Sequence, residues 1–306
     1  MLTYIMLAGG LLGLFLGGDW LVRGASQIAA RFNVPPLIIG LTIVGFGTST
    51  PELLVSLQAA FDGLPGIAIG NVVGSNIANI LLIPGLAGVI APPVANFTKM
   101  RRDLLWMLGA AVVMPVIIYS GFVGRTEGAL LLIGLVTYLT LSFYAMRNEP
   151  TDAMPSSAKL LPAIGFSLAG LVAVMVGANY LVESATIIAR QLGVSEAMIG
   201  LAIVAVGTSL PELATTVAAA IKGEREIALG NVIGSNIFNI LAILGLTGLI
   251  IPIPVDPRFM SFDVPVMVGA TALTLALIFT RGEVSRIVGA AMIAGYAGYI
   301  AIGASL

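Results

Sequence analysis

Two glutamates stand in parts of the chain where a charge is costly. Glu52 follows the apolar stretch LTIVGFGTSTP and precedes LLVSLQAA, and Glu212 stands in a similar stretch of the second half. A carboxylate in hydrocarbon costs roughly 3 kcal/mol or more. Two facing carboxylates also repel each other, so one takes up a proton or a cation lies between them. The pair indicates a cation site, and the alternative is two structural acids bonded to neighbouring helices.

A proline directly precedes each glutamate. Its missing N–H group and its ring free or disturb the carbonyl groups three and four residues earlier, and a glycine at this point weakens the helix further. A simple packing kink is the alternative, but the neighbouring hydroxyl residues favour a break that exposes carbonyl oxygens to an ion. The residues concerned are Gly47, Thr48, Ser49 and Pro51 in the first stretch and Gly207, Thr208, Ser209 and Pro211 in the second.

A second motif, Gly-Asn-Val-x-Gly-Ser-Asn-Ile-x-Asn-Ile, occurs at 70–80 and again at 230–240. Its polar residues at a spacing of four share one helix face. Part of this polarity is expected to serve hydrogen bonds between helices, with Asn76 and Asn236 as candidates. Beside two carboxylates, however, two such faces make an all-oxygen cage, which suits Ca²⁺ with its 6–8 oxygen ligands. The stripes are Asn71, Ser75 and Asn79, and Asn231, Ser235 and Asn239.

The composition sets the class of protein. Of 306 residues, 58% are hydrophobic and 9% are charged, the net charge is -1, and neither Cys nor His occurs. Soluble proteins carry about 25% charged residues, so a soluble enzyme, a disordered chain and a nucleic-acid binder are excluded. Without Cys or His there is no thiolate nucleophile and no usual zinc site. The apolar N-terminus is expected to be the first span rather than a signal peptide.

The hydropathy pattern predicts an all-α polytopic membrane protein with ten transmembrane helices, because a span needs about 20 apolar residues. Residues 1–147 form the first half, 148–159 a short cytoplasmic linker, and 160–306 the second half. The predicted spans are 2–30, 35–61, 66–91, 103–121, 126–146, 160–190, 196–221, 227–251, 261–279 and 285–304.

The two halves match at one constant offset, which pairs Glu52 with Glu212, and 15 of 21 positions are identical between 70–90 and 230–250. Five spans in each half make the second half enter the membrane in the opposite direction. Such inverted repeats are typical of secondary transporters, which bind their substrate near the bilayer midplane. The positive-inside rule places both termini outside the cytoplasm, with 11 Lys and Arg residues inside and 3 outside.

The motif pair, present twice, resembles the two alpha repeats of the sodium/calcium exchangers, within the cation/calcium exchanger superfamily. The resemblance covers nearly the whole chain, and the short linker resembles the compact prokaryotic members. It implies a sodium/calcium antiporter of the cell membrane that exports Ca²⁺ in exchange for Na⁺ by alternating access. It implies no enzymatic activity and no cofactor; the lipid bilayer and the two ions are the expected partners, without nucleic acid or an obligatory protein.

By position, the resemblance implies that Glu52 and Glu212 bind calcium together with the carbonyl oxygens of Thr48 and Thr208. It also implies sodium sites and a polar centre lined by two asparagines. Potassium-dependent relatives carry Asp at the second of these, so Asn239 argues against potassium coupling. The implied sodium ligands are Ser49, Ser75, Ser209 and Ser235 with the carbonyls of Gly45 and Ala205, and the central asparagines are Asn79 and Asn239.

Three other functions remain as alternatives. A proton/calcium exchanger would use the two glutamates as proton carriers. A cation channel could use the same cage, but channels usually build a pore from several subunits around an axis. A hydrolase using Ser49 lacks a nearby His or Lys as base. Outside the motifs, Asp19 and Arg23 are expected to pair across one helical turn, and Gly9, Gly13 and Gly17 predict close helix packing.

Overall fold

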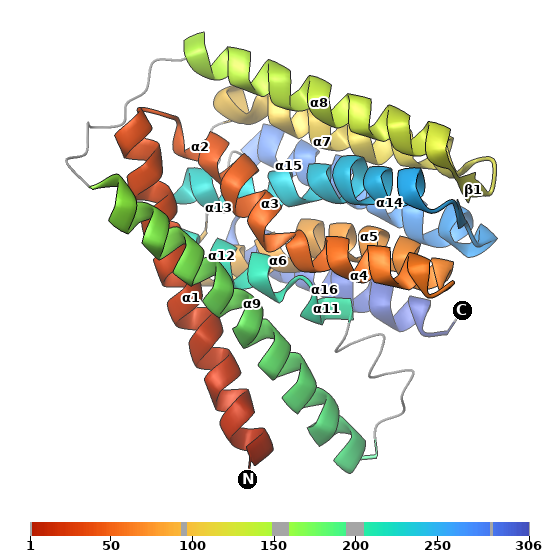
Figure 1. Cartoon of the computed structure of the whole chain (residues 1–306), viewed down its shortest axis with the longest axis horizontal. Helices are drawn as coiled ribbons and strands as arrows, with labels where there is room; N and C mark the ends of the chain where they lie inside the picture. Colours follow the sequence, from red (N-terminus) through yellow and green to blue (C-terminus); the bar gives the residue numbers. More distant parts are fainter. Residues whose placement is uncertain (1, 93–96, 149–158, 194–204, 282–283, 306) are drawn as a thin grey trace.

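The computed structural model describes residues 2–92, 97–148, 159–193, 205–281 and 284–305. This part of the chain is almost wholly helical (Figure 1). Two short strands, β1 (Phe122–Val123) and β2 (Ile253–Pro254), pair antiparallel, with Phe122 opposite Pro254. They join one connection of the first half to one of the second, at positions that do not correspond in the repeat.

The helices of the first half fall into straight rods and broken rods. The long rods are α1 (Leu2–Phe32), α7 (Phe97–Ile118) and α8 (Arg125–Asn148). The first broken rod consists of α2 (Pro36–Ile39), the π-helical turn η1 (Gly40–Val44), α3 (Gly45–Thr48) and α4 (Thr50–Phe61). The second consists of α5 (Pro65–Ile77), the π-helical turn η2 (Ala78–Leu82) and α6 (Ile83–Ile90).

The described part of the second half has its elements in the corresponding order. Its long rods are α9 (Leu160–Gln191), α15 (Val264–Arg281), which continues the turn η5 (Phe259–Asp263), and α16 (Arg286–Gly303). The short helices α11 (Ala205–Gly207) and α12 (Leu210–Ile221) correspond to α3 and α4, and α13 (Arg225–Phe238), η4 (Asn239–Leu244) and α14 (Gly245–Ile250) correspond to α5, η2 and α6. π-helical turns of this kind are frequent at functional sites.

The chain is a multi-span membrane protein. Seven helical segments of the described residues are long and apolar enough to cross a membrane, and an eighth arises if the pair 36–48 and 50–61, bent by 40°, forms one span. The predicted fourth span coincides with α7, which begins with a charged turn and is not among these segments. The predicted seventh span, 196–221, lies partly outside the described residues. The number of ten spans therefore stays a prediction.

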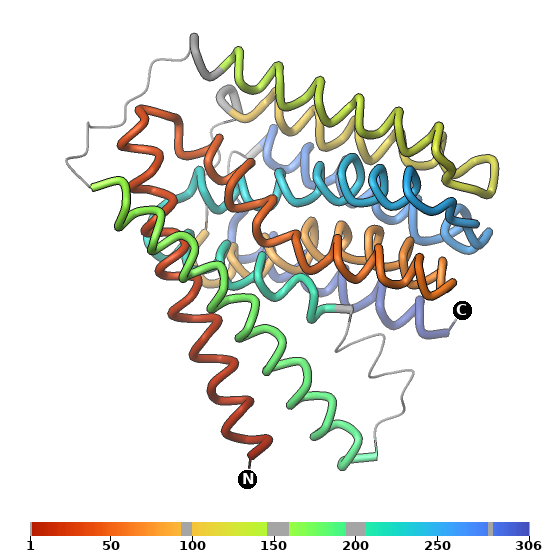
Figure 2. The backbone as a smooth tube through the Cα atoms, viewed as in Figure 1, coloured from red at the N-terminus to blue at the C-terminus, as the bar shows by residue number. Residues whose placement is uncertain are grey.

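Helices α1 and α9 lie side by side and run obliquely to the other helices (Figures 1 and 2). Their backbones touch because glycines stand at the crossing: a Cβ atom on Gly17 would lie 2.6 Å from the N atom of Val174, and one on Gly10 would lie 2.8 Å from the carbonyl oxygen of Gly177. Gly9 has no neighbour within 4 Å of such a Cβ atom. The glycine prediction is thus wrong at Gly9, where the packing face passes through Gly10 instead.

The centre of the molecule holds the two polar helices. Every residue of α13 from Ile227 to Phe238 is buried, and most of α5 is buried as well. Apolar side chains of α5, α7, α13 and α15 make the main core around them. The motif of α13 is therefore enclosed by protein, whereas Asn71 in the motif of α5 is half-buried, and the buried polar atoms of both motifs need partners.

The predicted ion pair between Asp19 and Arg23 is wrong. Oδ1 of Asp19 lies 2.6 Å from Nζ of Lys222 at the end of α12. The guanidinium carbon of Arg23 lies 5.0 Å from the centre of the Phe166 ring of α9, a cation–π distance. Asp19 and Arg23 each contact a residue of a neighbouring helix rather than each other. The spacing of the two residues along α1 could not predict these partners.

Candidate functional site: a buried oxygen cage

The two helical rods that carry Glu52 and Glu212 break where the sequence predicts a break. Helix α3 ends at Thr48, Ser49 has the non-helical angles φ -83° and ψ 4°, and α4 begins at Thr50. Ser209 has φ -89° and ψ 6° between α11 and α12. In each case proline is in the first turn of the new helix, where its missing N–H group costs nothing. The breaks place the glutamates in first turns as well.

The two glutamates are fully buried, each with an exposed fraction of 0%. Glu52 lies in the first turn of α4 and Glu212 in the first turn of α12. The N-terminal end of a helix carries partial positive charge and stabilises a nearby anion. The broken helices therefore partly offset the cost of a buried carboxylate, and they direct both carboxylates to the interior.

Each glutamate receives a hydrogen bond from the serine of the other half. The hydroxyl group of Ser49 donates to Oε1 of Glu212 at 3.0 Å. The hydroxyl group of Ser209 donates to Oε1 of Glu52 at 3.5 Å. The two breaks thus lie against each other, and the carboxylates share one region of the interior.

Threonines next to the breaks make a second crossed pair of contacts. Thr48 Oγ1 donates to Oδ1 of Asn231 on α13 at 3.2 Å. Thr208 Oγ1 donates to Oδ1 of Asn71 on α5 at 3.3 Å. Each contact joins one half to the other, and the two contacts involve the same residue types at corresponding positions of the repeat. Thr48 Oγ1 also lies 3.0 Å from the Val44 carbonyl oxygen of its own segment, so its single proton is shared between this acceptor and Asn231.

The side-chain amides of these asparagines also donate hydrogen bonds to the two helices that carry the glutamates. Asn71 Nδ2 donates to the Glu52 carbonyl oxygen at 2.9 Å and to Ser56 Oγ at 2.8 Å. In the second half the same bonds run from Asn231 Nδ2 to the Glu212 carbonyl oxygen at 3.2 Å and to Thr216 Oγ1 at 2.9 Å. Sequence reasoning missed Ser56 and Thr216, although each stands four residues after a glutamate and so shares its helix face.

The remaining predicted serines also contact the opposite half. Ser235 Oγ donates to the carbonyl oxygen of Gly45 at 3.3 Å. Ser75 Oγ lies 3.4 Å from Thr208 Oγ1, with either atom as donor. Ala205 is the first residue of α11. The structure thus brings the predicted hydroxyl groups and the Gly45 carbonyl to the contact between the two halves.

Several buried oxygens and amides at this contact have no partner among the described residues. They include Oε2 of Glu52, Oε2 of Glu212, and both amide atoms of Asn79 and of Asn239. All four residues have an exposed fraction of 0%. Buried polar groups without partners are rare because each costs free energy. Carboxylate and amide oxygens without hydrogen-bond partners are the ligands that a dehydrated hard cation requires.

Asn76 and Asn236 do not bond between helices as expected. Each donates from Nδ2 to the carbonyl oxygen four residues earlier in its own helix, at 2.7 Å. Their amide groups support the helices just before the π-helical turns. Among the described residues no group of three or more acidic, His or Cys side chains could hold a metal ion. Neutral oxygens must therefore complete any coordination around the two carboxylates.

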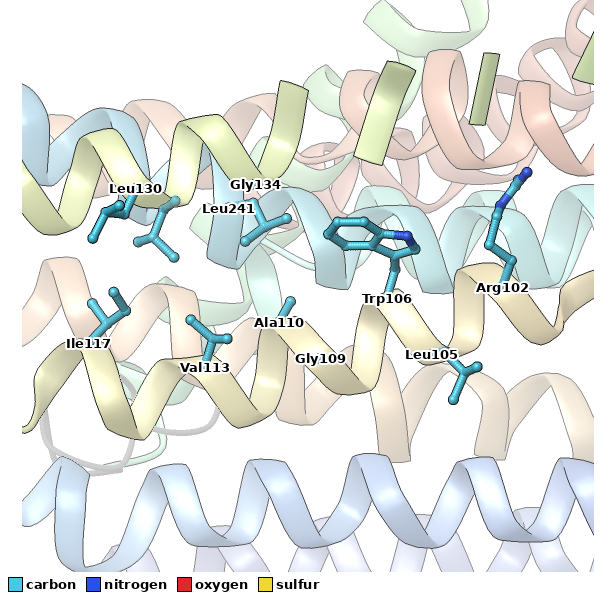
Figure 3. Close-up of a pocket in the computed structure, with 11 residues that line it drawn as sticks. Arg102, Leu105, Trp106, Gly109, Ala110, Val113, Ile117, Leu130, Gly134 and Leu241 are labelled. Carbon is cyan, nitrogen blue, oxygen red and sulfur yellow. The ribbon is translucent and has the colours of Figure 1, made fainter. Parts of the chain in front are cut away.

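An apolar groove elsewhere in the molecule has a lining of different chemistry. A cavity of about 460 Å³ lies between α7 and α8, with Leu241 of η4 at its inner wall (Figure 3). Its lining is hydrocarbon apart from Trp106 and Arg102, and Arg102 lies at one end, where it pairs with Asp103 at 3.0 Å. Without an unpaired carboxylate or carbonyl among its lining side chains, this groove does not suit a cation.

Comparison with known proteins agrees with this geometry. The family described as sodium/calcium exchanger protein matches residues 2–144 and 162–303. The inner membrane protein YrbG of Escherichia coli is 38% identical over 99% of this chain and 97% of its own length. The sodium/calcium exchanger MaX1 of Methanosarcina acetivorans is 35% identical over 98% of each chain.

The fold has a solved counterpart. The structure of the sodium-calcium exchanger NCX_Mj, soaked with Na⁺ and Ca²⁺, superposes with a TM-score of 0.85 at 35% identity over 98% of each chain. Both the sequence matches and the structural match extend over the segments that carry Glu52 and Glu212 and over the two polar helices α5 and α13. The chain belongs to the sodium/calcium exchanger family.

Proposed function

We propose that the protein is a sodium/calcium antiporter that exports Ca²⁺ in exchange for Na⁺. The observation that carries the proposal is the group of unpaired, fully buried acceptors at the contact between the halves, above all Oε2 of Glu52 and of Glu212. Two carboxylates balance the charge of one divalent cation. The ions are the transported substrates, and the proposal includes neither an enzymatic reaction nor a cofactor.

Calcium takes the centre of the cage in this proposal. Glu52 and Glu212 are its charged ligands, and the carbonyl oxygens of Thr48 and Thr208 complete the coordination from the two breaks. Support comes from the position of both glutamates in first helical turns directly after the breaks. The amides of Asn79 and Asn239 line the centre, since their atoms are buried there without other partners.

Sodium occupies smaller sites on either side of the calcium position. Neutral hydroxyl and carbonyl oxygens suit a monovalent ion, because no further carboxylate is needed to balance its charge. The contact of Ser235 with the Gly45 carbonyl supports one such site. By the correspondence of the two halves, Ser75 and the Ala205 carbonyl make the other. The proposed sodium ligands are Ser49, Ser75, Ser209 and Ser235 with the Gly45 and Ala205 carbonyls.

We infer that the architecture is ten spans in two inverted repeats, 1–147 and 160–306, joined by a cytoplasmic linker, with both termini outside the cell membrane. Two contacts between corresponding positions of the halves support this: Thr48 with Asn231, and Thr208 with Asn71. Helices α1 and α9 then slide past the core to switch access. An empty cage leaves two bare carboxylates in a region of low dielectric constant, which opposes switching without ions.

The test is uptake of radioactive calcium into proteoliposomes. Vesicles loaded with sodium and diluted into sodium-free buffer should accumulate calcium, and vesicles with a pH gradient alone should not. Uptake driven by the pH gradient alone would instead make the protein a proton/calcium exchanger, in which Glu52 and Glu212 carry the protons. Ion flux far above the turnover of transporters, without need of a counter-ion, would identify a channel.

A further inference from the structure

The two halves of the molecule differ in how their glutamate helices are covered. Helix α1 packs on α12: a Cβ atom on Gly18 would lie 3.0 Å from the Ala214 carbonyl oxygen and 3.2 Å from Cβ of Ala218. The positions that correspond to these alanines on α4 are Leu54, which is 59% exposed, and Gln58, which is also exposed. Helix α9 therefore does not cover α4 as α1 covers α12.

One ion pair ties α1 to the covered helix. Nζ of Lys222 lies 2.6 Å from Oδ1 of Asp19 and donates to the Asp19 carbonyl oxygen at 3.1 Å. Lys222 is the C-terminal cap of α12, at the opposite end of that helix from Glu212. An apolar groove of about 390 Å³ between the two helices ends at this pair. The other contact residues named between α1 and α12, which are Gly18, Ala214 and Ala218, carry no charge, so the ion pair is a specific electrostatic contact on this surface.

The other half cannot form an equivalent tie. The positions that correspond to Asp19 and Lys222 are Asn179 and Asp62. Asn179 carries no charge, and the carboxylate of Asp62 accepts both of its described hydrogen bonds from Gln58 Nε2, at 2.9 and 3.0 Å. The ion pair is therefore a feature of one side of the molecule, although the surrounding elements are repeated.

We propose that Asp19 and Lys222 are positioning residues that set the resting equilibrium between the two access states. The inference rests on the proposed function, since it requires alternating access. In a transporter with inverted repeats the second state exchanges the roles of the halves, so α1 leaves α12 and α9 covers α4. The Asp19–Lys222 pair then exists in one state only and stabilises the state seen here. With the proposed orientation, the closed side is cytoplasmic.

The size of the effect follows from the exposure of the pair. Side-chain exposure is 29% for Lys222 and 43% for Asp19. An ion pair open to water is weak, so its loss should change the ratio of the two states about two- to fivefold. This shift is too small to abolish transport but large enough to measure as a population.

The chain contains no cysteine, so a thiol-reactive spin label attaches only at an introduced cysteine. Labels at Leu12→Cys on α1 and Ile221→Cys on α12, both exposed positions, would report the distance between the two helices by electron paramagnetic resonance in liposomes without calcium. Asp19→Asn and Lys222→Met should each lower the ratio of the short-distance to the long-distance population about two- to fivefold. The charge exchange Asp19→Lys with Lys222→Asp should restore it.

A matched variant tests whether the half of the molecule that carries the ion pair decides which access state is favoured. Asn179→Asp with Asp62→Lys places an equivalent pair on the other half, and it should shift the population in the same direction as loss of the natural pair. Glu183→Gln, an exposed change on α9, should leave the population unchanged. A merely structural role for Asp19 would not produce a shift of the population by an ion pair placed on the other half.

The outcomes separate this inference from the proposed function. The inference is overturned if the populations stay the same in Asp19→Asn and Lys222→Met, whether one or two distances are seen. Sodium-driven calcium uptake by the same vesicles would still uphold the antiporter. Absence of uptake in the unmodified protein under any ion gradient overturns the proposed function, and with it the meaning assigned to the two distances.

Discussion

The hydroxyl group of Ser49 donates a hydrogen bond of 3.0 Å to Oε1 of Glu212, a residue 163 positions further along the chain. Ser209 makes the corresponding contact with Glu52. Each broken helix therefore supplies a donor to the carboxylate of the other half. Neither half holds a complete set of ligands, so the proposed cage exists only where the two halves meet, and movement of one half against the other would change its geometry.

Neutral replacement of either central carboxylate should abolish calcium transport. Glutamine keeps the size of the side chain and can still accept a hydrogen bond from the opposite serine, but it removes a charge that the cation needs in a buried site. For Glu52→Gln or Glu212→Gln we expect sodium-driven uptake of radioactive calcium to fall at least about 100-fold, since breaking a buried charge pair costs about 3 kcal/mol or more.

The matched control for these variants is Glu183→Gln, the same substitution at an exposed position of α9, which should transport normally. Elution as a single peak from a sizing column and an unchanged helical circular dichroism spectrum would show that the variants fold. Calcium flux at the unmodified rate in either central variant would remove that glutamate from the proposed site.

Loss of a serine hydroxyl should affect sodium more than calcium. Ser235→Ala and Ser75→Ala should each raise the sodium concentration for half-maximal calcium efflux about fivefold, as expected for loss of one hydrogen-bonding ligand worth about 1 kcal/mol. Calcium binding measured without sodium should change little. Ser305→Ala, at an exposed position near the C-terminus, is the control. Equal changes in the sodium and calcium dependence would argue against separate sodium sites.

The contact between Thr48 and Asn231 should couple the two halves energetically. Thr48→Val removes the donor and leaves Oδ1 of Asn231 without it, which should cost about 1–3 kcal/mol of stability. The thermal inactivation midpoint in detergent measures this loss. In the double variant with Asn231→Leu, the loss should be smaller than the sum of the single losses, because the two residues act on one interaction.

Thr50→Val serves as the control for that cycle. Its hydroxyl group bonds to the Phe46 carbonyl oxygen within its own segment and is exposed, so it should show no coupling to Asn231→Leu. Strict additivity between Thr48→Val and Asn231→Leu would mean that the contact does not hold the halves together.

The crossing of α1 and α9 should not tolerate a side chain at its tightest glycine. A Cβ atom on Gly170 would overlap the N atom of Leu21 and lie 2.7 Å from the Gly17 carbonyl oxygen. Gly170→Ala should therefore lower the inactivation midpoint, with a cost of about 1–3 kcal/mol for overpacking. Gly165→Ala on the same helix meets no atom within 4 Å and should leave the midpoint unchanged. Equal behaviour of the two variants would contradict the packing described.

Much of the site could be predicted from the sequence because its elements are set by local rules. A proline lacks the N–H group that a helix interior needs, and a glycine four residues before it weakens the helix further, so the breaks before Glu52 and Glu212 follow from local residues. The helical period places Asn71, Ser75 and Asn79 on one face without knowledge of any neighbour. The repetition of both motifs at the same offset identified them as one paired site.

The partners of these residues were not predictable in the same way. Periodicity tells which face of a helix is polar, but not which helix lies opposite. Asp19 shows the limit: Arg23 stands at the right spacing for an ion pair, yet the carboxylate binds Lys222 in the other half of the chain. Asn76 shows the converse, because a polar side chain expected to reach a neighbouring helix bonds to its own backbone.

The sequence by itself determined the membrane class, the two broken helices and the residue types of the proposed cage, because composition, proline and helical period act over a few residues. Only the tertiary structure decided that Ser49 meets Glu212, that Thr48 meets Asn231, and that α1 covers a face of α12 whose counterpart on α4 stays exposed. These contacts depend on how rods from opposite halves of the chain pack together, and that packing is set by the combined shape of many side chains rather than by any local pattern.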